Sequence, residues 1–194
     1  SAILAALYER ERSGHGQYID LSLLDTQVAW LANQNLNYLV TGRPPQRRGT
    51  AHPNIVPYQA FATADGHLML AVGNDAQFAR FCAAAGVPQL AADPRYATNA
   101  NRVAHRVELV AAVAWLLRTR STQAWLDALG AAQVPCGPIN DLAQVFDEPQ
   151  VRHRELRLDL PHPLAGTAPG VRNPVRFDRS ALEYRRAPPP LGAD

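Results

Sequence analysis

Apolar residues recur with the spacing of an α-helix over much of the N-terminal part of the chain. One stretch covers residues 1–13 and ends at Gly14, where a glycine typically follows the last helical turn. A second begins after Ser22, a typical helix N-cap, and continues to Val40. Residues 18–21 alternate between polar and apolar side chains, which indicates a short strand between the two predicted helices.

The pattern changes repeatedly in the rest of the chain. Residues 43–57 have no periodicity and contain four prolines, which predicts a long loop of the kind that often carries function. Alternating stretches on both sides of Asp65-Gly66 predict a β-hairpin. Further helices are predicted over residues 74–85, 101–117, 121–129 and 141–146, with a turn at 135–138 and an extended segment over 171–177 in a proline-rich tail.

This order of elements predicts an α/β protein in which helices dominate and a small hairpin lies in the middle. The 194 residues suffice for one domain or two small ones. The chain starts at Ser1 rather than at a methionine, and its tail has few apolar residues to pack on. We therefore expect a piece of a longer protein whose tail lies on another domain or another chain.

The composition is that of a globular protein. Hydrophobic residues make up 47% and charged residues 19% of the chain, with a formal net charge of +2. No run of 18 apolar residues occurs, so no membrane-spanning segment is expected. The basic side chains apart from histidine are all arginines, and outside residues 43–48 they alternate with acids. That spacing favours solvated faces over a nucleic-acid-binding surface.

Cysteine and histidine offer little chemistry by their spacing. Cys82 and Cys136 are too few for a disulfide framework, which favours a reducing, cytoplasmic setting. The six histidines show neither HxxxH nor HExxH spacing, and none is paired with a cysteine as in a zinc site. We therefore expect no metal site.

The long loop holds the strongest candidate binding residues. Its glycine allows a close approach of the backbone to a ligand, and its arginines offer charge for a carboxylate or phosphate. The alternative is a surface turn with solvated arginines. The candidate residues are consecutive: Arg47, Arg48, Gly49, Thr50, Ala51, His52, Pro53 and Asn54.

The chain resembles the family III CoA-transferases, the group that contains formyl-CoA transferase, carnitine CoA-transferase and α-methylacyl-CoA racemase. Each matching motif is weak alone, but the set occurs in order along nearly the whole chain. The motifs are residues 1–10 (SAILAALYER), 16–25 (GQYIDLSLLD), 49–58 (GTAHPNIVPY), 71–75 (AVGND), 93–96 (DPRY), 134–139 (VPCGPI) and 186–192 (RAPPPLG).

This resemblance implies a protein about twice as long, of which this chain is the C-terminal half. The family fold has a large Rossmann-like domain built from both ends of the chain and a smaller α+β domain between them. Residues 1–57 would supply large-domain helices and the active-site loop, 58–130 the small domain, and 131–194 the return to the large domain. Two such chains would interlock as a homodimer, with the active site between domains and subunits.

The resemblance also implies a covalent mechanism. An aspartate carboxylate attacks the donor thioester to give a mixed anhydride, and the released CoA thiolate then forms an enzyme-bound CoA thioester. The family places that aspartate shortly upstream of the residue that matches Ser1, so no catalytic residue is expected within this chain, and the chain alone is expected to be inactive. Coenzyme A thioester is the substrate, and no tightly bound cofactor is expected.

The sequence of residues 49–58 most resembles that of the family branch that moves CoA between dicarboxylates, such as succinyl-CoA:glutarate CoA-transferases. Formyl-CoA transferases carry a run of glycines in this loop, whereas only Gly49 occurs here. The partners implied are an acyl-CoA and a small carboxylic acid. Two alternatives remain open: an acyl-CoA racemase or epimerase of the same family, and a non-catalytic interaction module.

Overall fold

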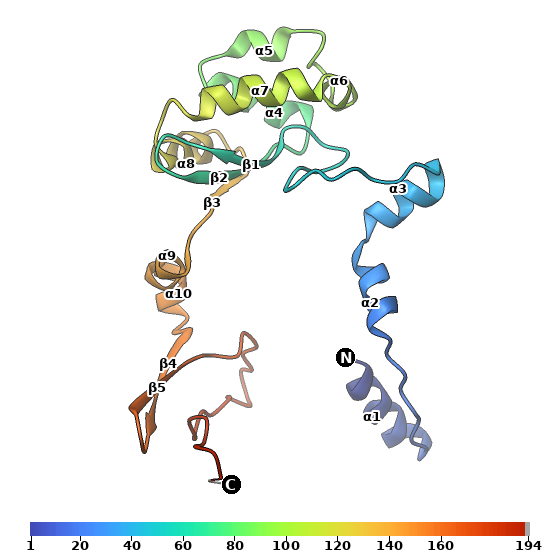
Figure 1. Ribbon diagram of the computed structural model, residues 1–194, viewed down its shortest axis with the longest axis vertical. Helices are drawn as coiled ribbons and strands as arrows, with labels where there is room; N and C mark the ends of the chain where they lie inside the picture. Colours follow the sequence, from blue (N-terminus) through green and yellow to red (C-terminus); the bar gives the residue numbers. More distant parts are fainter. Residues whose placement is uncertain (193–194) are drawn as a thin grey trace.

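The computed structural model describes residues 1–192, which form a compact central part and two extended arms (Figure 1). The first arm descends from the central part on the right of Figure 1 and has no buried residue in any of its three helices. These helices are α1 (Ala2–Ser13), α2 (Leu23–Trp30) and α3 (Asn33–Thr41).

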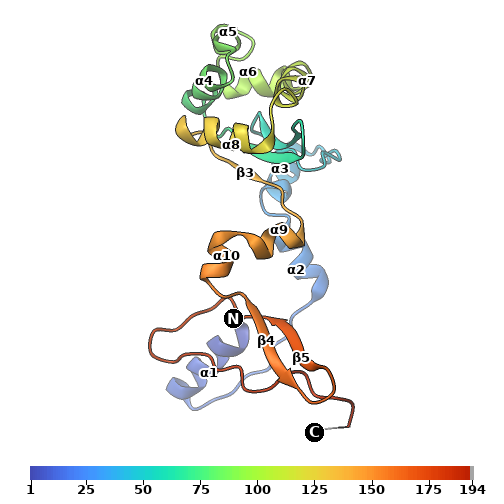
Figure 2. The same cartoon turned by 90° about the vertical axis from the view of Figure 1, so that its left-hand side faces the viewer.

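The central part contains an antiparallel three-stranded sheet with the order β1-β2-β3. Strands β1 (Tyr58–Ala62) and β2 (His67–Ala71) form the predicted hairpin, and β3 (Cys136–Pro138) pairs with β2. Five helices accompany this sheet, and most of them lie above it in both views (Figures 1 and 2). They are α4 (Asp75–Ala84), α5 (Pro88–Ala92), α6 (Asn99–Ala104), α7 (Arg106–Leu117) and α8 (Thr122–Ala131).

The hydrophobic core lies between the sheet and these helices. Every buried apolar residue of the described chain falls between Val56 and Val134. Trp125 is the largest of them, and its indole N–H donates to the Leu117 carbonyl at 2.7 Å. The core side chains come from both layers: Phe61, Leu68 and Leu70 from the sheet, and Phe78, Phe81, Leu109, Val113, Leu117, Trp125 and Leu129 from the helices.

The second arm leaves the central part after β3 (Figure 2). Two short helices, α9 (Leu142–Asp147) and α10 (Pro149–His153), lead to a hairpin of β4 (Arg157–His162) and β5 (Gly166–Val171). After β5 the described chain continues without helix or strand to residue 192. None of the described helices is long and apolar enough to cross a membrane.

The predicted helix ends are confirmed at several positions. Gly14 and Gly42 adopt the left-handed conformation that ends α1 and α3. The side chains of Ser22, Asn74 and Ser121 each accept a hydrogen bond from the backbone N–H three residues on. These caps were visible in the sequence because they depend on residues that are close together in the chain.

Two predicted helices are interrupted. The helix predicted to run from Ser22 to Val40 breaks at Ala32, whose φ is 45°, and the Asn35 side chain donates to the Val28 carbonyl across the break. Such a side-chain bond replaces a helical one, which periodicity alone does not reveal. The helix predicted over residues 101–117 begins at Asn99 and is likewise divided, at His105, into α6 and α7.

The strands differ from the prediction in three places. Residues 18–21 form no strand and pair with no described segment of the chain. Residues 136–138 were predicted as part of a turn but pair with β2 as an edge strand, where proline is tolerated. The β4–β5 hairpin was not predicted, and most of the segment predicted as extended over residues 171–177 lies beyond it.

Asp65 joins the β1–β2 hairpin to helix α8. Its carboxylate accepts hydrogen bonds from the Thr122 backbone N–H at 2.7 Å and from the Thr122 hydroxyl at 3.0 Å. The Thr63 hydroxyl donates to the same oxygen at 3.3 Å. The two Thr122 bonds favour the ionised form and lower the pKa of Asp65.

We expect acid to weaken this connection. Because the folded-state pKa of Asp65 is below its unfolded value, its stabilisation is complete above the ordinary aspartate pKa and is lost as the pH falls through the lower folded-state value. In the complete protein, the stability difference between wild type and Asp65→Asn should be constant from pH 7 to 5, and it should narrow below about pH 4. Chemical denaturation at several pH values measures it. A difference that widens with acid would contradict this assignment.

Candidate functional site

The candidate loop connects α3 to β1 and changes character along its length. Residues 43–50 are all exposed, whereas Ala51, His52 and Pro53 are half-buried and Val56 is fully buried. The change occurs at a turn in which the Ala51 N–H donates to the Arg48 carbonyl at 3.1 Å. Gly49 has a φ of 59° inside this turn, a conformation that residues with a Cβ rarely adopt.

Two of the predicted binding residues hold the loop against β1. The Thr50 hydroxyl accepts a hydrogen bond from the Ala60 N–H at 3.0 Å. The His52 ring stacks on Tyr58 with centroids 5.3 Å apart, and its Nδ1 accepts from the Asn54 N–H at 3.1 Å. Within residues 1–192, the Nε2 atom of His52 forms no hydrogen bond and is not fully buried.

Helices α6 and α7 hold the second half of the loop through side chains that the sequence did not single out. Asn99 donates to the Asn54 carbonyl at 2.8 Å and accepts from the Val56 N–H at 3.2 Å. Arg106 donates to the Pro53 carbonyl at 2.7 Å. A third residue, Arg102, donates to the Val56 carbonyl at 2.8 Å. These contacts position the loop from residues about fifty positions away in the chain.

Arg102 is completely buried. Besides Val56 it donates to the Tyr96 carbonyl at 2.9 Å and to the Asp75 carboxylate at 2.8 Å, and it lies 4.6 Å from the centroid of the Phe78 ring. Asn99 and Arg102 lie three residues apart on α6, and Arg106 is the first residue of α7, so the three side chains reach the loop from both sides of the break at His105. Their spacings of three and four were the signal that the sequence offered.

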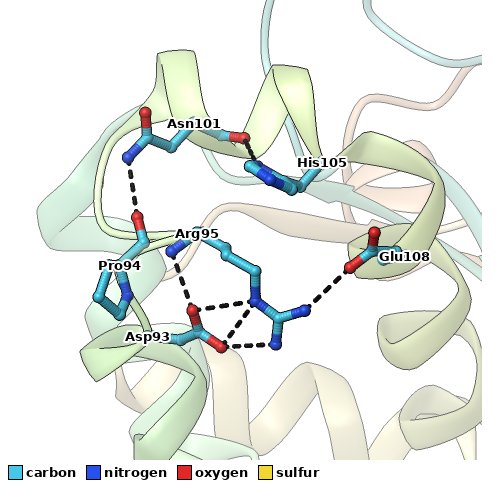
Figure 3. Close-up of polar contacts among 6 residues, drawn as sticks. All are labelled: Asp93, Pro94, Arg95, Asn101, His105 and Glu108. Atoms are coloured by element: carbon cyan, nitrogen blue, oxygen red, sulfur yellow. Dashed lines mark hydrogen bonds and ion pairs between the residues drawn. The ribbon is translucent and has the colours of Figure 1, made fainter.

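The Asp93-Pro94-Arg95-Tyr96 motif forms a surface network around α6 and α7 (Figure 3). Arg95 bridges Asp93 at 2.7 Å and Glu108 at 3.0 Å, and its hydrogen bonds lower the pKa of Asp93. Asn101 donates to the Pro94 carbonyl at 2.8 Å, and its own carbonyl lies 3.0 Å from the His105 Nδ1. The network therefore holds the segment that contains Tyr96, whose carbonyl accepts a hydrogen bond from Arg102.

The first half of the loop presents charge without an internal partner. Within residues 1–192, neither Arg47 nor Arg48 forms an ion pair or a side-chain hydrogen bond, and both are exposed. Arg48 and Pro53 line two open cavities, one of about 290 Å³ beside α7 and one of about 430 Å³ beside α3. The guanidinium of Arg48 is therefore placed to bind an anion in either cavity.

We also considered the possible metal ligands and the two cysteines of the described residues. Residues 1–192 contain no group of three or more His, Cys, Asp or Glu side chains placed to hold a metal ion. Burial raises the pKa of Cys82 to about 11 and also raises that of Cys136, so both thiols are protonated at neutral pH.

Curated relatives match the chain over almost its whole length. It is 50% identical over 192 residues to a succinate–glutarate CoA-transferase from Agrobacterium fabrum, covering 99% of this chain and 48% of the relative. It is 41% identical to the succinyl-CoA:glutarate CoA-transferase of Mus musculus, covering 98% of this chain and 44% of that protein. The chain thus spans about half the length of these relatives.

A solved structure and a family model also match the chain. The crystal structure of a CAIB/BAIF family protein from Brucella suis superposes with a TM-score of 0.75 at 42% identity, covering 96% of this chain and 48% of that one. The fold is therefore the mixed α/β fold of that group, present here over about half of its length. The model of CoA-transferase family III matches residues 1–194, and this chain belongs to that family.

Proposed function

We propose that the complete protein transfers CoA from succinyl-CoA to a dicarboxylate such as glutarate. The observation that carries this proposal is the 50% identity, over 99% of the chain, to a relative named succinate–glutarate CoA-transferase. The uncompensated Arg48 beside two cavities supports it further, since a dicarboxylate keeps one carboxylate free while the other reacts. Coenzyme A acts as a substrate, without a tightly bound cofactor.

The proposed mechanism begins outside this chain, at an aspartate upstream of Ser1. Its carboxylate attacks the thioester carbonyl of succinyl-CoA, forms a mixed anhydride and releases the CoA thiolate. The thiolate attacks the aspartyl carbonyl of the anhydride, which gives an enzyme CoA thioester and free succinate. The acceptor carboxylate then repeats these steps in reverse and leaves as the new acyl-CoA. Water must be excluded, because an anhydride hydrolyses.

We assign the covering of this site to the candidate loop. The residues are Arg47, Arg48, Gly49, Thr50, Ala51, His52, Pro53 and Asn54. Their arrangement supports the assignment, because the second half of the loop is fixed to α6 and α7 while the first half stays exposed with its arginines. Backbone N–H groups of the exposed half would stabilise the oxyanions that form at the reacting carbonyls.

We further propose that residues 1–57 and 131–194 belong to a large domain and residues 58–130 to a small one. The confinement of the core to residues 56–134 supports a division close to these bounds, although β3 (Cys136–Pro138) still pairs with the central sheet. The apolar side chains exposed on α1 and α2, such as Leu4 and Leu24, would pack against the remainder of the large domain. The complete protein would act in the cytoplasm as an interlocked homodimer.

Incubation of the complete protein with succinyl-CoA and a panel of acids tests the function. Glutarate, malate, itaconate, oxalate and formate are offered separately, and new acyl-CoAs are identified by mass. A new dicarboxyl-CoA supports the proposal and names the acceptor. Absence of exchange together with racemisation of a branched acyl-CoA would instead identify a racemase, and absence of both reactions would favour a non-catalytic module.

The isolated 194 residues are expected to be inactive in the same assay, because the proposed nucleophile lies upstream. The measurement is CoA transfer to glutarate by equal molar amounts of the isolated chain and of the complete protein. Mixing the isolated chain with the upstream half is a suitable control, since restored transfer would show that the chain is competent to complete the site. Transfer by the chain alone would contradict the upstream placement of the nucleophile.

A further inference from the structure

The cavity beside α7 contains two arginines from different parts of the chain. Arg48 lines it from the candidate loop and Arg106 from the first turn of α7, and Pro53 lines it as well. The cavity measures about 290 Å³ and lies open to solvent, which suits a short organic acid. Val103 and Ala104 add an apolar wall along which a short carbon chain can lie.

The positive charge in this cavity is not neutralised by the described chain. Arg106 uses one nitrogen on the Pro53 carbonyl, and no carboxylate of residues 1–192 pairs with Arg48 or Arg106. Glu108 also lines the cavity, but its carboxylate is held by Arg95 at 3.0 Å. Burial and the nearby charge of Arg48 both lower the pKa of Arg106. An anion placed between the two guanidinium groups would relieve this repulsion.

We propose that Arg106, together with Arg48, forms the subsite that binds the free carboxylate of the dicarboxylate substrate. This inference rests on the proposed function and deepens it, because it names a specificity-determining residue outside the loop. Arg106 is well placed for this role, since its bond to Pro53 fixes the guanidinium at the edge of the cavity. The reacting carboxylate at the other end of the acid would then point away from the two arginines.

The test compares glutarate with its half-amide, glutaramate, as acceptors for the complete protein. The two acids differ only in that the free carboxylate of glutarate is a neutral amide in glutaramate. In Arg106→Gln the KM for glutarate should rise about 10- to 100-fold, as loss of a charge-assisted hydrogen bond predicts. The KM for glutaramate should change little, so that the preference for glutarate disappears. Arg106→Lys should restore part of it.

Arg118→Gln is the matched control, because Arg118 is an exposed arginine at the opposite end of α7. It should keep the preference for glutarate. An equal loss with both acids in Arg106→Gln would overturn the proposal and assign Arg106 to positioning Pro53. A weaker affinity for free CoA in calorimetry, with the glutarate preference kept, would overturn it in favour of a phosphate of CoA.

Direct binding separates this proposal from the proposed function. Calorimetric titration of glutarate and glutaramate into wild type and Arg106→Gln needs no turnover. If the wild type transfers CoA to no acid, the proposed function fails, but a preference for binding glutarate that Arg106→Gln abolishes would still support the subsite. If wild type transfers CoA and Arg106→Gln alters neither glutarate binding nor its KM, the subsite is wrong while the proposed function stands.

Discussion

Replacing Arg102 with methionine is expected to lower the free energy of unfolding of the complete protein by about 2–6 kcal/mol, because two buried carbonyls each lose their donor at a cost of about 1–3 kcal/mol. Methionine retains much of the side-chain volume over Phe78 but leaves the Val56 and Tyr96 carbonyls, which Arg102 now pairs, without their donor. Chemical denaturation followed by tryptophan fluorescence measures the loss, with buried Trp125 as a reporter of the core.

Arg95→Met provides the comparison. Arg95 also makes several ion pairs and hydrogen bonds, but its side chain is 54% exposed and water can replace its contacts. We therefore expect a much smaller loss than for Arg102→Met. Similar losses of unfolding free energy in the two variants would contradict this expectation, because they would show that the burial of Arg102 adds little to the stability that its bonds provide.

Local features of this fold were predictable from the sequence, whereas long-range ones were not. The hairpin around Asp65-Gly66 and the cap at Asn74 depend on neighbouring residues, and both were found. The pairing of β3 with β2 joins Leu70 to Cys136, which are far apart in the chain, and no local pattern indicates it. The break at His105 could not be predicted either, because the apolar spacing of a helix continues across it while the helical conformation of the backbone does not.

The candidate loop was similarly predictable only in part. Its lack of periodicity and its prolines identified it, and the structure places its eight candidate residues between α3 and β1. What holds the loop could not be inferred, because Arg102 and Arg106 appeared to be polar positions on an ordinary helix and Asn99 lay before its predicted start. Their spacing of three and four residues is a weak indication by itself, because the same spacing is common on solvent-exposed helices.

Replacing Asn99 with aspartate should reduce turnover, because this single-atom change disturbs the contact between α6 and the loop. The side-chain amide of Asn99 donates to the Asn54 carbonyl, and aspartate would place an oxygen opposite that carbonyl instead. If the loop covers the reacting anhydride as proposed, a displacement of about 1 Å is enough to lower kcat up to about 100-fold. Steady-state kinetics of the complete protein with succinyl-CoA and glutarate measures the loss.

The same substitution at Asn101 separates loop placement from helix stability. Both asparagines lie in the first turn of α6, and the side-chain amide of Asn101 likewise donates to a backbone carbonyl, that of Pro94 at 2.8 Å. Each substitution removes one such donor and should cost a similar stability of about 1–2 kcal/mol. Of the two asparagines, Asn99 donates to the loop and Asn101 to Pro94. The kcat should therefore fall in Asn99→Asp and be nearly unchanged in Asn101→Asp. Equal kcat values in the two variants would show that the contact with Asn54 does not control the reaction.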